Sequence, residues 1–153
     1  VAEDNPMNQI VVRTMLQRMG HQVVLVDNGA HALETLGERA DIDLVLMDVQ
    51  MPVMDGLEAV RRLRTKETGS GLPVIALTAQ ALTGDREACL RAGMNAYLTK
   101  PLDRGALEET IRELTVRAPR APVAIDRRAL AERVGTDPRI LGQLAGLFVS
   151  DAA

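Results

Sequence analysis

The side chains best suited to chemistry in this sequence are three acids, one hydroxyl and one lysine. In chain order they are Glu3, Asp4, Asp48, Thr78 and Lys100. Three carboxylates brought together repel one another unless a cation lies among them, and Mg²⁺ binds such oxygens while leaving positions open for a phosphoryl oxygen. A lysine and a hydroxyl can hold other phosphoryl oxygens, and an aspartate in this setting can act as a nucleophile. These residue types therefore suit phosphoryl transfer, which needs mainly positioning and charge neutralisation.

Short apolar runs would position these side chains. The runs are apolar throughout rather than alternating, which is typical of strands buried on both faces of a parallel sheet. They are Val23–Val26, Leu44–Met47, Val74–Leu77 and the weaker Ala96–Leu98. Functional loops lie at the carboxyl ends of the strands in doubly wound sheets. We therefore expect Asp48, Thr78 and Lys100 to gather at one edge.

Segments with helical periodicity alternate with the runs, which predicts a doubly wound α/β fold. The expected helices are Pro6–Met19, His31–Arg39, Asp55–Lys66, Gly84–Ala92 and Asp103–Val116. Arg61, Arg62 and Arg64 are expected to form a solvated face of the third helix. Only Val1 and Ala2 precede the acidic pair, so the first strand is expected to be truncated.

The end of the chain departs from this alternation. Prolines at positions 119 and 122 predict a linker over residues 118–124. Helical patterns at 126–134 and 138–150 predict a helical fragment over residues 125–153, which is too short to form its own core. The expected domains are therefore residues 1–117, the linker and this C-terminal fragment.

Composition excludes several classes of protein. The 18 Lys and Arg against 21 Asp and Glu give a net charge of −3, which excludes nucleic-acid binding through bulk positive charge. No apolar run is long enough to span a membrane, so no membrane contact is expected of this chain. The single cysteine, Cys89, cannot form an internal disulfide and favours a cytoplasmic location.

Four motifs, in order and spacing, resemble those of two-component response-regulator receiver domains. They are Glu3-Asp4-Asn5, Asp48–Gly56, Ala76–Ala79 and Tyr97–Pro101. The sequences of the second and third motifs are similar to those in receivers of hybrid sensor histidine kinases. The resemblance covers residues 1 to about 117. It implies a flavodoxin-like, five-stranded parallel sheet with the strand order 2-1-3-4-5.

The resemblance implies a metal site and a phosphoacceptor. Asp48 resembles the phosphorylated aspartate of the family. Glu3 and Asp4 resemble the acidic pair that holds Mg²⁺ together with Asp48 and the backbone carbonyl of Gln50.

Four more residues resemble the part of the family's site that binds phosphate and switches. Lys100 resembles the phosphate-binding lysine, whose peptide bond to Pro101 is usually cis. Thr78, followed by Ala79, resembles the hydroxyl that moves toward the phosphoryl group. Tyr97 resembles the aromatic residue that swings inward behind it.

The implied function is a phosphoacceptor module that receives a phosphoryl group from a phosphohistidine. The implied partners are a histidine kinase or a histidine-phosphotransfer (HPt) domain, with receiver dimerisation as a further expectation. Residues 125–148 are similar to the start of an HPt domain. The expected parent is a hybrid histidine kinase, which can be anchored in a membrane. This chain has no kinase core, so it is expected only to promote its own phosphorylation and dephosphorylation.

Two other functions stay open. A metal-dependent phosphatase with an aspartate nucleophile would need an acid two residues after Asp48, where Gln50 stands and cannot donate a proton. The intact Asp48 and Lys100 argue against a docking module that is never phosphorylated, but the truncated first strand leaves this alternative open. His21 and His31 are expected to be surface or packing residues rather than phosphorelay histidines.

Overall fold

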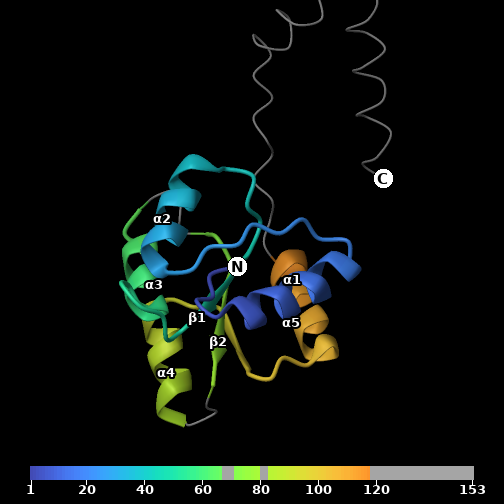
Figure 1. Ribbon diagram of the computed structural model, residues 1–153. Helices are drawn as coiled ribbons and strands as arrows, with labels where there is room; N and C mark the ends of the chain where they lie inside the picture. The colour runs from blue at the N-terminus through green and yellow to red at the C-terminus, as the bar shows by residue number, and fades with distance from the viewer. Residues whose placement is uncertain (67–70, 80–82, 118–153) are drawn as a thin grey trace, which may run out of the picture. The chain divides into compact units, whose positions relative to one another are not determined.

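The computed structural model describes residues 1–66, 71–79 and 83–117, and in them helices cover both faces of a parallel sheet (Figure 1). The linker and the C-terminal helices expected from the sequence lie outside these residues. The helices are α1 (Pro6–Arg18), α2 (Gly29–Glu38), α3 (Gly56–Arg64), α4 (Thr83–Ala92) and α5 (Arg104–Arg117). The strands are β1 (Val45–Asp48), β2 (Val74–Thr78) and β3 (Ala96–Thr99). Within this part of the chain, no helix has the length and apolar character needed to cross a bilayer.

The sheet has the order β1-β2-β3, with every neighbouring pair parallel. Asp48 lies opposite Leu77, and Thr78 lies opposite Thr99, so the strands end at a common edge. All residues of β1 and β2 are buried, as their continuous apolar runs predicted. The doubly wound α/β fold is confirmed.

The expected first two strands are present only as isolated bridges among the described residues. Ala2 forms parallel bridges with Val26 on one side and Met47 of β1 on the other. Backbone hydrogen bonds of 2.8–3.0 Å flank Ala2 on both sides. The spatial order therefore follows the expected 2-1-3-4-5 arrangement. Val1 also pairs with this segment, since its amino group donates to Val24 O at 2.7 Å and its carbonyl accepts from Val26 N at 2.9 Å.

Two apolar clusters lie on opposite faces of the sheet. On one face, α1 and α5 pack against Leu46, Ile75 and Leu77. On the other face, α2, α3 and α4 pack against the side chains of the alternate strand positions, such as Met47 and Ala76. This alternation is expected of strands that are buried on both sides.

The five helices predicted within the described residues form, with bounds within two residues of those expected. The largest difference at a helix start is in α2, which begins at Gly29 rather than His31 because Asn28 is its N-cap. The Asn28 side chain accepts a hydrogen bond of 2.9 Å from the backbone nitrogen of His31. Such an acceptor satisfies one of the free donors in a first helical turn.

Arg64 does not belong to a solvated face, which corrects the expectation from the sequence. Its guanidinium is half-buried and donates to Gly93 O at 2.9 Å, Leu72 O at 2.8 Å and Asn95 Oδ1 at 3.0 Å. Burial lowers the pKa of Arg64. The end of α3 is thereby joined to the segments that precede β2 and β3, at the edge of the sheet opposite Asp48.

Candidate functional site

Three polar side chains meet at the carboxyl edge of the sheet. Asp48 ends β1, Thr78 ends β2, and Lys100 follows β3 directly. The backbone nitrogen of Lys100 donates to Thr78 O at 2.8 Å, which extends the pairing of β2 and β3 by one step. The backbone thus brings these residues together where parallel strands were expected to place them.

Glu3, Asp4 and Asp48 form an acidic cluster at this edge. Each offers a carboxylate oxygen, and these oxygens all lie within 4.8 Å of one another. Glu3 and Asp48 are buried, with 0% and 5% of their surface exposed, whereas Asp4 is exposed. Ala2, held between Val26 and β1, fixes the position of the two acids that follow it.

Lys100 provides the positive charge nearest to these acids. Its Nζ atom lies 2.5 Å from Glu3 Oε2 and also pairs with Asp48 Oδ2. Burial acts to lower the pKa of Lys100, but the attraction of the Asp48 and Glu3 carboxylates outweighs it and the pKa is raised. Lys100 therefore stays a cation at neutral pH. The peptide bond from Lys100 to Pro101 is cis.

The Asp48 carboxylate is held on both of its oxygens. Oδ1 accepts a hydrogen bond of 3.1 Å from the backbone nitrogen of Gln50, and Oδ2 is paired with Lys100. Burial raises the pKa of Asp48 above its ordinary value, in the same direction as the nearby charge of Glu3, although Lys100 and Gln50 oppose the shift. A cation placed beside Asp48 would favour its ionised form.

Glu3 is held from the start of α1. Its Oε1 atom accepts from Asn8 Nδ2 at 2.9 Å and from the backbone nitrogen of Asn5 at 3.3 Å. Its buried Oε2 atom has the charge of Lys100 beside it but no hydrogen bond of regular geometry. A buried carboxylate oxygen in this state, beside two further acids, fits an oxygen-liganded divalent cation such as Mg²⁺.

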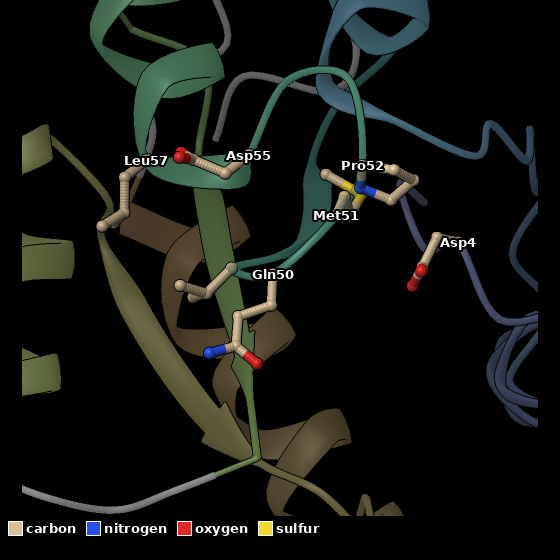
Figure 2. Close-up of a pocket in the computed structure, with 7 residues that line it drawn as sticks. Asp4, Gln50, Met51, Pro52, Asp55 and Leu57 are labelled. Atoms are coloured by element: carbon tan, nitrogen blue, oxygen red, sulfur yellow. The ribbon is translucent and has the colours of Figure 1, made fainter.

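A cavity of about 560 Å³ opens beside the acidic cluster, and Figure 2 shows Asp4 on the N-terminal segment across from the loop that follows β1. The loop contributes both polar and apolar side chains. The lining residues are Asp4, Val49, Gln50, Met51, Pro52, Asp55 and Leu57. Sequence reasoning gave no role as lining residues to Met51 and Pro52 of this loop or to Leu57 of α3, because only the fold brings the loop and the start of α3 to the cavity. Gln50, expected to offer its carbonyl, is in this loop.

Thr78 and Tyr97 lie on one face of the sheet. Thr78 is buried at the end of β2, and the following Ala79 is exposed. Tyr97, in β3, lies opposite Ala76, one pleat away from Thr78, and packs half-buried against the core. The guanidinium of Arg86, from α4, lies over its ring. Tyr97 is thus at the rim of the site rather than in the acidic cluster.

The two histidines are not part of the acidic cluster. His21 and His31 are both exposed. His31 Nδ1 lies 2.7 Å from Asp27 Oδ1, one helical turn away at the start of α2. This local pairing agrees with the expected surface role.

The family profile described as "Response regulator receiver domain" matches residues 1–112. The chain belongs to this family. The sensor protein GacS of Pseudomonas syringae pv. syringae is 40% identical over 148 residues, which cover 95% of this chain and 16% of that protein. The sensor histidine kinase RcsC of Salmonella typhi is 39% identical over 111 residues, which cover 72% of this chain and 11% of that protein. The receiver therefore spans only a small part of these relatives.

Solved receiver domains share the fold. The receiver domain of sensor histidine kinase PA1611 from Pseudomonas aeruginosa, crystallised with a magnesium ion in its active-site cleft, is 45% identical with a TM-score of 0.71. The match covers 75% of this chain and 93% of that one. The Ssk1 receiver from Saccharomyces cerevisiae, crystallised with the HPt protein Ypd1, is 32% identical with a TM-score of 0.70 and coverages of 75% and 86%. The chain is accordingly a phosphoacceptor module of a two-component phosphorelay.

Proposed function

We propose that Asp48 is the residue of this receiver that accepts the phosphoryl group. The observation that carries the proposal is the convergence of Asp48, Glu3 and Lys100 on ion-pair distances at the carboxyl edge of the sheet. The Asp48 carboxylate is fixed by Gln50 N and Lys100, so one of its oxygens is presented in a defined orientation. Positioning of this kind accounts for much of the catalysis of phosphoryl transfer.

In the proposed step, an Asp48 oxygen attacks the phosphorus of a phosphohistidine. A phosphorus–oxygen bond forms, the phosphorus–nitrogen bond breaks, and its electron pair stays on the imidazole. Protonated Lys100 neutralises charge on the transferred oxygens, for which its raised pKa suits it. The Thr78 hydroxyl and the backbone nitrogen of Ala79 donate to the same group, and Tyr97 responds by moving inward.

A divalent cation belongs to this proposal. Glu3, Asp4, Asp48 and the carbonyl of Gln50 would hold Mg²⁺, which neutralises phosphoryl oxygens when bound. The oxygen-only donor set and the Glu3 Oε2 atom without a regular hydrogen bond support this assignment. The magnesium-bound PA1611 receiver supports it from a relative.

We further propose that the phosphohistidine belongs to a histidine kinase or an HPt domain, as the Ssk1–Ypd1 complex suggests by analogy. A hybrid kinase as parent and an HPt domain starting near residue 125 belong to the same proposal. So do a cytoplasmic location and self-association of the receiver. The net charge of −3 gives no support to a nucleic-acid partner.

The intact mass of the chain after incubation with Mg²⁺ and acetyl phosphate tests the proposal. We expect a gain of one phosphoryl group that is absent from Asp48→Asn, whose amide cannot form the acyl phosphate. Circular dichroism establishes that both proteins are folded. A persistent gain in Asp48→Asn would reject Asp48 as acceptor, and no gain in the folded natural chain would favour a docking module.

A further inference from the structure

The ring of Tyr97 is in contact with a cation from another element. The guanidinium carbon of Arg86, on α4, lies 5.5 Å from the centroid of the Tyr97 ring. This distance is within the range of cation–π attraction, which arises from the negative face of the aromatic ring. Arg86 is exposed and Tyr97 half-buried, so the contact lies at the surface between α4 and β3.

The strand register places Tyr97 on the same face of the sheet as Thr78 of the candidate site. Val74, Ala76 and Tyr97 belong to the same apolar cluster, whereas Ile75 and Leu77 belong to the cluster on the opposite face. Thr78 follows Ala76 by two positions, so it lies on the Tyr97 face. Tyr97 is opposite Ala76, whose side chain is only a methyl group. A ring that moves toward Thr78 meets little bulk from this strand position.

We propose that Arg86 is a positioning residue that holds the Tyr97 ring on the α4 side and thereby opposes its movement toward Thr78. The inference rests on the proposed function, in which Tyr97 moves inward when Asp48 is phosphorylated. The inference adds to the proposed function that the ring must leave the guanidinium group of Arg86 when it moves. Phosphorylation must then break the contact between Arg86 and the Tyr97 ring. The position of the ring thereby affects the contacts that α4 makes.

The charge of Arg86 is available for this contact. Within residues 83–92 the neighbouring Glu87 pairs with Arg91 at 3.7 Å, and Arg86 makes no ion pair among the described residues. An interaction made in only one of two ring positions shifts the ratio of those positions by its own free energy. For an exposed cation–π pair this shift is about two- to fivefold.

The composition of the chain provides a direct probe. Tyr97 is the only tyrosine and there is no tryptophan, so tyrosine fluorescence reports on this ring alone. Quenching by acrylamide measures how accessible the ring is to solvent. We expect Arg86→Gln to make the ring less accessible than in the natural chain, because the inward position gains about two- to fivefold in population. Arg86→Lys retains a cation and should restore much of the original accessibility.

Arg91→Gln is the matched control, because it removes the same charge from α4 without touching Tyr97. Thermal melting verifies that each variant is folded. A ring that becomes more accessible in Arg86→Gln, or stays unchanged, would overturn the inference, as would an equal effect of Arg91→Gln. Intact mass after Mg²⁺ and acetyl phosphate is measured on the same samples. A natural chain that gains no phosphoryl group rejects the proposed function, whereas the accessibility of unphosphorylated Arg86→Gln tests Arg86 independently.

Discussion

At the scale of single residues, Lys100 has two tasks at the candidate site. It neutralises the buried carboxylates of Glu3 and Asp48, and it offers an ammonium group to an incoming phosphoryl group. The two tasks compete, because a lysine that turns to phosphate leaves the acids less compensated. A divalent cation among the acids would release Lys100 from the first task.

We expect Lys100→Ala to keep some phosphorylation by acetyl phosphate. Phosphorylation of this variant should no longer change the solvent accessibility of the Tyr97 ring. The free energy of unfolding without Mg²⁺ should fall by about 3 kcal/mol, since two buried acids lose their counter-charge. Chemical denaturation, intact mass and acrylamide quenching measure these effects. Lys66→Ala, at an exposed position, is the control. An unaltered Tyr97 response would contradict the proposed role of Lys100.

Asp4 differs from Glu3 and Asp48 because its side chain is exposed rather than buried in the core. Asp4→Asn should therefore leave the fold intact and raise the Mg²⁺ concentration at half-maximal phosphorylation by about tenfold or more. The measurement is a Mg²⁺ titration of the initial rate with acetyl phosphate. Asp41→Asn, which removes an exposed acid paired with Arg39, should leave the titration unchanged. Equal midpoints for Asp4→Asn and the natural chain would exclude Asp4 as a ligand.

At the scale of elements, the start of α3 determines how the loop after β1 is closed. A Cβ atom at Gly56 would lie 2.1 Å from the carbonyl oxygen of Asp48 and 2.9 Å from Met47 Cγ. The backbone of Gly56 also donates to Val49 O at 3.0 Å. Glycine at this position lets the helix begin directly against the strand that carries Asp48.

Gly56→Ala should lower the free energy of unfolding by about 1–3 kcal/mol, because the methyl group would collide with the backbone. Phosphorylation should slow as well, since the collision is with Asp48 itself. Gly37→Ala is a matched control in α2, where a Cβ would meet nothing within 4 Å. This control should be neutral or stabilising by up to about 1 kcal/mol. Urea denaturation of both variants measures the difference, and equal stabilities would contradict the close approach.

The sequence predicted those elements whose formation depends on local pattern. Apolar runs of four residues predicted β1 and β2, and capping residues such as Asn5 predicted the start of α1. Val23–Val26 has the same pattern but forms a single bridge, Val26 with Ala2, beside hydrogen bonds to Val1, because pairing depends on a partner elsewhere in the chain. The five segments nevertheless lie in the predicted spatial order, with Ala2 between Val26 and β1.

At the scale of the whole molecule, the two edges of the sheet differ in chemistry. The carboxyl edge carries Glu3, Asp48 and Lys100, which the sequence predicted because each residue follows a strand. The opposite edge carries Arg64, whose burial the sequence did not predict. The sequence did not predict the contact of Arg86 with Tyr97 either. Both arginines acquire their partners from elements distant in the sequence, so only the packed molecule reveals them.

The pairing of Ala2 on both sides joins the middle of the sheet to the acidic cluster. Its amide donates to Leu46 O at 2.8 Å, its carbonyl accepts from Asp48 N at 2.9 Å, and Glu3 and Asp4 follow directly. A ligand that binds only the docked segment must stabilise it by mass action. Mg²⁺ should therefore slow hydrogen exchange of the Ala2 and Asp48 amides while the amide of Gly93, at the far edge, exchanges at an unchanged rate. Metal occupancy would then set how often the centre of the sheet opens, and magnesium availability would become a determinant of the lifetime of the folded receiver.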